Sequence, residues 1–508
     1  MRIGLKRYMT LFMAVLMVTV IIGGCGSSSG DSQSTGGNKS SQEKEAPKEI
    51  EIVLMNAGAG NSRDVELIQN EINKYVLDKI NVTVKLSVVA LSNYAQQMTL
   101  MLSGGEPLDL MVVMGNQIAP YASRNQIIPL DELLNKYGNG INEALGSFAK
   151  TGSIDGKIYA VPTLRDLSTG FGLIMRKDLL EKYNINSEDL KSLQDMTPVF
   201  DKIKKGEGKD FYPLIPNMPT VTFMDKYITV DRLDDGNGVL LDYGSKDTKV
   251  VFYEETEEYK QLAGLFHEWY KSGYILKDIA TSQENYGSLM RAGQGFAYFN
   301  NIKPGILLSA KNNTGYDCVN LQFIDYFATT TQVNSISWGI AQNSKSPEAA
   351  MKFLNLMYSD PKVVTLLTWG VEGTHYVYTD DKKHVKYPDG IDAKTSGWSL
   401  TAGWEMGNQF LTPVWENDAE DLWQQQKAAN DNAKKSMALG FAFDSTKVKN
   451  EITAITNIRN QYKPLIENGV VDPSSGILQE YIGKLKSAGM DKVIAEKQSQ
   501  LNAWLAAK

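Results

Sequence analysis

The feature that most constrains the fold is an alternation of apolar runs and amphipathic segments near the start of the chain. Three runs rich in aliphatic residues, at 50–55, 82–88 and 108–114, have the length of β-strands. Between them, apolar residues recur every three or four positions at 65–76 and 94–102, as on one face of a helix. This order implies right-handed crossovers and a largely parallel sheet. The sequence therefore predicts an α/β fold.

Two loops of this predicted sheet are candidates for ligand contact. In parallel sheets, ligands bind beyond the carboxyl ends of the strands. The loop at 56–61 follows the first strand and the loop at 115–117 follows the third. Topology alone therefore makes Asn56 and Asn116 candidate binding residues.

The N-terminus has the three parts of an export signal. Basic residues within 1–7 precede an apolar run at 9–22, and Gly23 and Gly24 stand directly before Cys25. The run is too short to span a bilayer comfortably, which takes about 20 apolar residues. Its end resembles the bacterial lipoprotein box, which implies cleavage before Cys25 and lipid attachment to that cysteine. The alternative is a plain secretory signal followed by an incidental cysteine.

The segment after Cys25 has the composition of a tether. Residues 26–48 consist almost entirely of small and polar residues, and such a segment buries too little surface to offset its ordering entropy. We therefore expect residues 1–24 to be a lipoprotein signal peptide. Residues 25–48 are expected to form the lipidated cysteine and a flexible tether.

Charge and cysteine content exclude some functions for the rest of the chain. The net charge of -7 argues against a nucleic-acid partner, which calls for a basic surface. The chain has two cysteines, so lipid on Cys25 would leave Cys318 unable to form an intramolecular disulfide. We expect Cys318 to be a buried, inert thiol.

Catalytic and metal-binding motifs give no convincing match. The zinc-protease, nucleophile-elbow and phosphate-loop patterns are absent from the sequence, and the three histidines have no metal-ligand spacing. Residues 231–238 (DRLDDGNG) are rich in oxygen ligands but lack EF-hand spacing, which favours a turn between strands. We expect no catalytic residue, no metal and no cofactor.

A series of short segments, in order along the chain, resembles landmarks of family 1 extracellular solute-binding proteins, which serve ATP-driven importers. The C-terminal residues 440–504 resemble the helical end of one lipoprotein branch of that family. The landmarks are residues 102–110 (LSGGEPLDL), 128–134 (IPLDELL), 155–162 (DGKIYAVP), 269–275 (WYKSGYI), 291–295 (RAGQG), 338–344 (WGIAQNS) and 370–376 (GVEGTHY).

The resemblance implies a two-lobed periplasmic-binding-protein-like fold with a hinge and an interlobe ligand cleft. It places the chain crossings between lobes at 161–162, near 298–301 and around 370–376. Each lobe is then discontinuous in sequence. The expected division is 49–162 for lobe 1 (first part), 163–300 for lobe 2 (first part), 301–376 for lobe 1 (second part), and 377–508 for lobe 2 (second part) with a helical C-terminal region.

The solutes of that family are often sugars, and sugars need flat aromatic faces and planar polar side chains. Polar candidates follow a strand or a predicted crossing, and aromatic candidates lie in irregular, Gly-rich surroundings; for each tryptophan the alternative is a core position. The candidates are Asn56, Asn116, Arg165, Asp166, Asn300, Asn301, Trp338, Trp369, Tyr376, Trp398 and Trp404.

The expected function is that of a lipid-anchored, non-enzymatic receptor that captures a carbohydrate, namely an oligosaccharide, for an ABC importer. Its expected partners are the permease subunits and, through the lipid on Cys25, the membrane; we expect a monomer that binds no nucleic acid. The alternatives are a receptor for a peptide or another polar solute and an exported glycan hydrolase.

Overall fold

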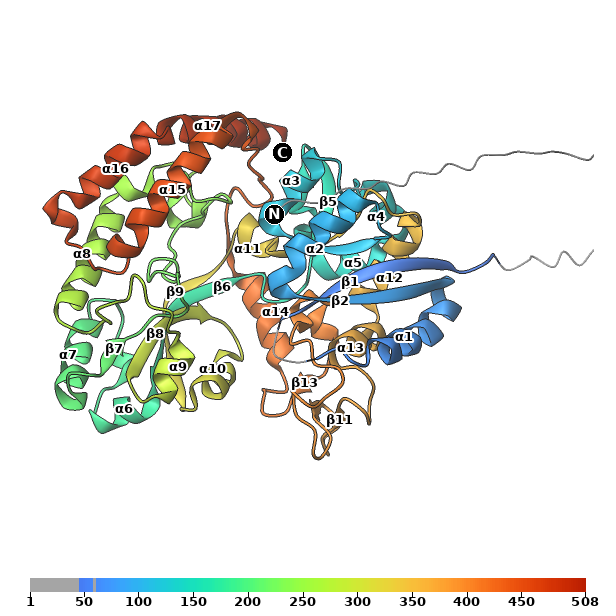
Figure 1. Ribbon diagram of the computed structural model, residues 1–508, viewed down its shortest axis with the longest axis horizontal. Helices are drawn as coiled ribbons and strands as arrows, with labels where there is room; N and C mark the ends of the chain where they lie inside the picture. The colour runs from blue at the N-terminus through green and yellow to red at the C-terminus, as the bar shows by residue number, and fades with distance from the viewer. Residues whose placement is uncertain (1–44, 58–60) are drawn as a thin grey trace, which may run out of the picture. The chain divides into compact units, whose positions relative to one another are not determined.

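The computed structural model describes residues 45–57 and 61–508 of the chain (Figure 1). The predicted signal peptide, Cys25 and most of the predicted tether lie outside the described residues. Within the described ranges, no helix combines the length and the apolar character that a membrane crossing requires.

The first sheet contains the predicted alternation. Strand β1 pairs in parallel with both β2 and β3, so the expected parallel crossovers are confirmed. Strand β10 enters from much later in the chain and runs antiparallel to β3 and β5, and β4 is antiparallel to β5. The sheet is therefore mixed and not largely parallel as predicted, because strands outside the first alternation complete it. In spatial order the strands are β2 (Val82–Ala90), β1 (Lys48–Asn56), β3 (Leu110–Met114), β10 (Ile336–Ile340), β5 (Lys157–Pro162) and β4 (Gly152–Ile154).

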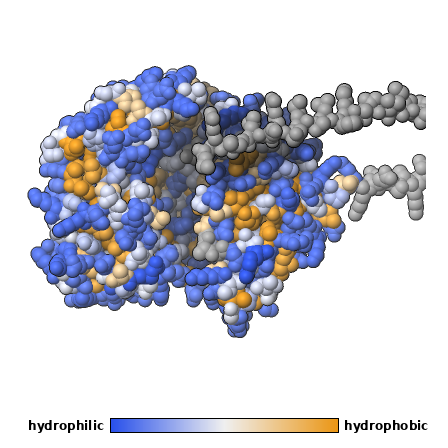
Figure 2. Space-filling model, viewed as in Figure 1, coloured by the Kyte–Doolittle hydropathy of each residue, from blue (hydrophilic) through white to orange (hydrophobic). Residues whose placement is uncertain are grey.

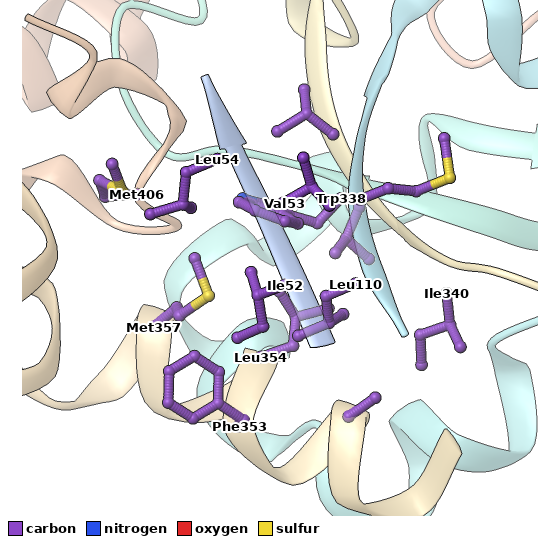
Figure 3. Close-up of a cluster of buried hydrophobic side chains, with 14 of the residues drawn as sticks. Ile52, Val53, Leu54, Leu110, Trp338, Ile340, Phe353, Leu354, Met357 and Met406 are labelled. Atoms are coloured by element: carbon purple, nitrogen blue, oxygen red, sulfur yellow. The ribbon is translucent and has the colours of Figure 1, made fainter. Parts of the chain in front are cut away.

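Among the residues that the structure describes, seven helices accompany this sheet, and its core forms around β1. Ile52 and Leu54 on β1 meet Phe353, Leu354 and Met357 of α12, and all five side chains have no exposed surface (Figure 3). The helices are α1 (Val65–Ile80), α2 (Leu91–Gly104), α3 (Ile118–Ser123), α4 (Asp131–Tyr137), α5 (Asn139–Leu145), α12 (Pro347–Ser359) and α13 (Pro361–Trp369).

The second sheet has its own core. Strand β6 lies between β8 and β9 and is antiparallel to both. The strands in order are β14 (Lys434–Lys435), β9 (Cys318–Ala328), β6 (Thr169–Arg176), β8 (Gly295–Ile302) and β7 (Tyr212–Leu214). Its helices are α6 (Lys177–Lys182), α7 (Met196–Glu207), α8 (Glu257–Lys271), α9 (Tyr286–Arg291), α10 (Ile306–Thr314), α15 (Lys449–Ile466), α16 (Ile477–Ser487) and α17 (Met490–Ala507).

The C-terminal helices α15 to α17 confirm the predicted helical end. Ile455, Tyr481 and Val493, one from each helix, are fully buried in the core of the second sheet. Cys318 lies in the same core as a free thiol, as expected, and burial raises its pKa.

Three segments connect the two sheets. Residues 163–168 join β5 to β6, and residues 329–335, which include α11 (Thr330–Val333), join β9 to β10. The third runs through α14 (Leu422–Asn432) to β14, which pairs with β9. A small separate sheet of β11 (Val377–Tyr378), β12 (His384–Lys386) and β13 (Val414–Trp415) precedes α14.

The connection at 163–168 follows directly on residues 161–162, whereas the strand pairings place the other two connections elsewhere than predicted. The chain does not cross after β8 at 298–301, because β9 pairs antiparallel with β6 on the edge opposite β8 and so belongs to the same sheet. The chain leaves this sheet only after Ala328. Residues 301–328 therefore belong with the second sheet, not the first. Trp398 and Met406, expected in lobe 2, pack in the core of the first sheet, so the third crossing comes after residue 406 and not at 370–376.

Candidate ligand-binding site

The connecting segments meet in a network of ion pairs and hydrogen bonds. Arg165 pairs with Asp166 and donates to the hydroxyl of Ser335 in the next connection. Asp166 also accepts from Nζ of Lys303, at 2.7 Å, just beyond β8. Nδ2 of Asn430 in α14 donates to the carbonyl oxygen of Arg165, at 2.6 Å. All three connections are therefore tied together at one place.

The Asp166 carboxyl of this network is fully paired, whereas one nitrogen of the Arg165 guanidinium is not. Burial by itself would raise the pKa of the Asp166 carboxyl, but the positive charges of Arg165 and Lys303 outweigh it and hold that pKa at about 2. The side chain of Arg165 is 12% exposed, and its buried Nε has no hydrogen-bond partner. Arg165 and Asp166 are thus brought together, as a paired unit.

The end of β8 brings two more predicted residues together. Asn300 Oδ1 accepts from the backbone N–H of Asn301 at 2.9 Å. Asn301 Oδ1 accepts from Nζ of Lys226 at 3.2 Å, and Nδ2 of Asn217 donates to the carbonyl oxygen of Phe299 at 2.8 Å. All four polar side chains are partly or wholly buried beside the last residues of the strand.

At the edge of the first sheet, Asn56 is the last residue of β1 and Asn116 lies in a short 3₁₀ turn at Gly115–Gln117. The side chain of Asn116 is outside the described atoms. A later segment braces the loop that follows β1, because Ala57 and Asp64 donate their backbone N–H groups to the carbonyl oxygens of Leu400 and Gly397.

Two of the predicted tryptophans are core residues. Trp338 has no exposed surface, and its Nε1 donates to the carbonyl oxygen of Glu405 at 2.6 Å. Trp398 is 2% exposed, and its Nε1 donates to the carbonyl oxygen of Leu367 at 3.0 Å. Their Gly-rich flanks suggested loops, but the structure packs both indoles inside the first core.

The other aromatic candidates form separate groups. Trp369 packs against Trp415 with ring centroids 5.2 Å apart. Tyr376 is 6% exposed and meets Tyr378 edge to face at 5.7 Å. Trp404 is half-buried against the first core. The aromatic candidates therefore do not converge on one surface.

A second set of aromatic residues, not predicted from the sequence, lies at the end of the second sheet. Tyr243 stacks on Phe327, with ring centroids 3.9 Å apart and ring planes at 24°. Phe171 packs against Phe327 as well, with ring centroids 5.8 Å apart. Tyr227 packs against the same cluster, and its ring centroid is 6.4 Å from that of Phe323. We call Phe171, Tyr227, Tyr243 and Phe327 the aromatic platform.

The aromatic platform adjoins the polar residues of β8. Phe171 on β6 is the register partner of Asn301, and antiparallel partners project to the same face of a sheet. The β6–β9 register shifts beside Phe171. Tyr227 follows Lys226 in sequence and contacts Phe299 at 5.9 Å. Rings for apolar contact and amides for hydrogen bonding therefore share one surface.

The backbone that holds Tyr243 is strained. Asp242 and Tyr243 both have left-handed conformations, with φ of 48° and 60°, which bulky residues rarely adopt. Such strain persists only where the surroundings impose it, and it gathers at binding sites. Neither position is a glycine; the sequence signals are the glycine that follows at position 244 and the tolerance of Asp for this conformation.

The visible face of the molecule is mostly hydrophilic and has a recess between the half that carries β7 and α7 and the half that carries β1 and β2 (Figure 2). A hollow of about 440 Å³ lies between β9 and α14, beside Asp325, Tyr326 and Lys434. In the described ranges, no three His, Cys, Asp or Glu side chains are grouped closely enough to hold a metal ion.

Comparisons with known proteins agree with this architecture. Residues 71–377 match the family described as bacterial extracellular solute-binding proteins, and residues 437–506 match a domain of unknown function, DUF3502. A carbohydrate ABC transporter substrate-binding protein from Streptococcus pneumoniae serotype 4 is 28% identical over 512 residues, which covers 98% of each chain.

Solved structures share the fold. The crystal structure of the N-glycan transport solute binding protein NgtS from Streptococcus pneumoniae matches with a TM-score of 0.77 and 26% identity, over 90% of this chain and 99% of that one. Its complex with Man5GlcNAc matches with a TM-score of 0.68 and 26% identity, over 91% and 99%. The predicted periplasmic-binding-protein-like fold is confirmed. This chain belongs to the bacterial extracellular solute-binding protein family.

Proposed function

We propose that this protein binds an oligosaccharide outside the cytoplasm and delivers it to an ABC importer, without catalysing a reaction. The observation that carries the proposal is the full-length similarity to a protein named as a carbohydrate ABC transporter substrate-binding protein. A structural relative has also been solved in complex with Man5GlcNAc.

The chemistry of the aromatic platform supports a sugar ligand. Aromatic faces contact the C–H groups of a pyranose ring, and planar amides and charged groups bind its hydroxyls. The aromatic platform offers the partly exposed rings of Tyr227 and Tyr243. Asn301 and Lys226 supply polar groups beside it. Asn300 is the adjacent residue of β8, so its side chain projects to the opposite face of the strand, and it stays a separate candidate.

The remaining predicted residues divide into two groups. We retain Arg165 and Asp166 at the connections, and we propose that the first sheet contributes from the other side of the recess. Its remaining candidates are Asn56, Asn116, Trp369, Tyr376 and Trp404. The three aromatic residues lie in separate groups, so we do not expect all of them to contact one ligand. We leave out Trp338 and Trp398, because a buried indole with a satisfied N–H has no face left for a ligand.

We further propose that lipid on Cys25 anchors a monomeric protein beside its permease. One acyl chain holds a protein only marginally, whereas two or more hold it stably. Confinement by a short tether raises the effective concentration of the binding protein at the transporter.

A thermal-shift panel on protein lacking residues 1–25 tests the binding proposal. Neutral oligosaccharides built from mannose and N-acetylglucosamine should raise the melting temperature in a dose-dependent way, because ligand that binds only the folded state stabilises it. No new reducing ends should appear during prolonged incubation. A shift with peptides alone would favour a peptide receptor, and steady release of reducing ends would favour a hydrolase.

A further inference from the structure

A short turn at residues 222–227 carries two of the side chains proposed to contact the ligand. Nζ of Lys226 donates to Oδ1 of Asn301 at 3.2 Å, and the ring of Tyr227 belongs to the aromatic platform. Both side chains are partly exposed. Earlier in the same turn, the ring of Phe223 is buried in the second core. The turn therefore joins the candidate site to the core of the second sheet.

The carboxylate of Asp225 closes this turn. Its Oδ2 accepts from the backbone N–H of Thr222 at 3.2 Å and lies 3.0 Å from the Thr222 hydroxyl oxygen. The same hydroxyl oxygen accepts from the backbone N–H of Asp225 at 3.1 Å. Because Lys226 and Tyr227 follow Asp225 directly, the place of this carboxylate determines where the two ligand-contacting side chains begin.

The C-terminal region holds the turn through three polar side chains in the last turn of α15 and just beyond it. The three pairs are Lys463 with Asp225, at 2.6 Å between Nζ and Oδ1, Glu467 with Thr222, at 2.5 Å between Oε2 and Oγ1, and Asn468 with the backbone N–H of Phe223, at 3.2 Å from Oδ1. All three side chains lie within residues 437–506, which match the domain of unknown function.

The ion pair with Lys463 is the charged contact among these three. The side chain of Asp225 is 17% exposed, and Arg232 is its second counter-ion, at 3.1 Å. Burial by itself would raise the pKa of the Asp225 carboxyl, but the positive charges of Lys463 and Arg232 outweigh it and hold that pKa at about 2. Removing one partner from a largely buried ion pair is costly, so loss of Lys463 should loosen the turn that Asp225 closes.

We infer that the C-terminal region holds the 222–227 turn in its ligand-binding conformation, with Lys463 as a positioning residue. The inference rests on the proposed function and gives a task to the domain of unknown function. Lys463 acts through Asp225 on the two residues that follow it. A turn that is ordered before the ligand arrives loses less conformational entropy on binding, which raises the affinity.

Calorimetric titration of protein lacking residues 1–25 with Man5GlcNAc tests the inference. Lys463→Met should weaken binding about fivefold or more, because the turn must then be ordered as the ligand binds. Lys463→Arg keeps a charged donor for the Asp225 carboxylate and should bind within about twofold of the wild type. Lys492→Met is the matched control variant, since it removes an exposed ion pair of the same region, with Glu451 at 2.5 Å, and should leave the affinity unchanged.

Hydrogen exchange separates positioning of the turn from a general effect on folding. The backbone N–H groups of Thr222, Asp225 and Lys226 are all bonded within the turn. In folded Lys463→Met, the peptide that covers the turn should exchange about tenfold faster, while peptides of β8 exchange as in the wild type.

A second variant keeps the test decisive if Lys463→Met does not fold. Thr222→Val removes the hydroxyl that lies between the carboxyl groups of Asp225 and Glu467, with little change in side-chain volume. It should weaken binding about threefold or more and speed exchange in the same peptide.

An unchanged affinity in these folded variants, or a loss of affinity without faster exchange in the turn, would overturn the inference while leaving the proposed function in place. Failure of the wild type to bind Man5GlcNAc would contradict the proposed function for this glycan and remove the inference with it.

Discussion

The ammonium group of Lys497 lies 2.5 Å from Oδ1 of Asp235, although the lysine side chain has no exposed surface. The same nitrogen donates to the carbonyl oxygens of Leu233, at 3.1 Å, and Gly238, at 3.4 Å. The oxygen-rich loop at 231–238 therefore surrounds a cation supplied by α17. This contact fastens the C-terminal helix to the second sheet's core.

Replacing Lys497 with Met should destabilise the protein by about 3–5 kcal/mol, because it leaves a partly buried carboxylate and two carbonyls without their donor. Chemical denaturation followed by circular dichroism measures this loss. Lys492→Met in the same helix removes an exposed pair with Glu451 and should cost less than about 1 kcal/mol. Equal losses of stability in the two variants would contradict the claim that the loop at 231–238 depends on the Lys497 ammonium group.

Stability should fall as the pH rises from about 5 to 8, in part because of Glu467. Burial raises the pKa of this carboxyl to about 7, although Lys463 opposes the shift. The folded state holds the proton more tightly than the unfolded state, so the stabilisation is complete below the usual pKa of 4.5 and is lost through 7. The difference corresponds to about 3 kcal/mol. Glu467→Gln should weaken the dependence of the unfolding free energy on pH, as measured by denaturation curves at several pH values. A pH dependence as steep as that of the wild type would assign the effect to other groups.

Trp338→Phe should reduce stability by about 2–4 kcal/mol, because it leaves a cavity in the first core and removes the donor to the Glu405 carbonyl. The affinity for an oligosaccharide should change less than twofold. Urea denaturation and calorimetry on the same preparation measure the two effects. A large loss of affinity with intact stability would place the indole in the binding site instead.

Tyr243→Gly should weaken oligosaccharide binding at least tenfold and leave stability within about 1 kcal/mol of the wild type. Glycine adopts the left-handed conformation at this position without strain, so the loss of the ring is partly offset by relief of the backbone. Tyr378→Gly, which removes an exposed ring in the small separate sheet, is the comparison. Unchanged affinity in the Tyr243 variant would remove the aromatic platform from the site.

The parallel part of the first sheet was predictable because local patterns determine it, whereas the antiparallel pairings of β10, β5 and β4 were not predicted. The aliphatic runs and helical spacing between residues 50 and 114 became β1 to β3 with α1 and α2, in parallel as expected. The later crossings were not predictable, because β9 and β14 join the second sheet through pairings distant in sequence. No local sequence pattern distinguishes a strand that stays in the same sheet from one that joins the other sheet.

The candidate site was only partly accessible from the sequence. Arg165, Asp166, Asn300 and Asn301 could be chosen from the sequence because they follow strands or a connection, and their contact with a ligand stays a prediction. Tyr243 was missed, because its orientation depends on a strained turn and on Phe327, 84 positions later in the printed sequence. Gly-rich flanks misassigned Trp338 and Trp398, since flanking composition carries no information on burial.

The most direct measurement is calorimetric titration of the protein lacking residues 1–25 with Man5GlcNAc. The account predicts a saturable heat with a stoichiometry of one, lost on Tyr243→Gly and retained in Trp338→Phe. Flat titrations with this glycan and with a panel of other neutral oligosaccharides, from protein shown to be folded, would contradict the claim that the protein is an oligosaccharide receptor.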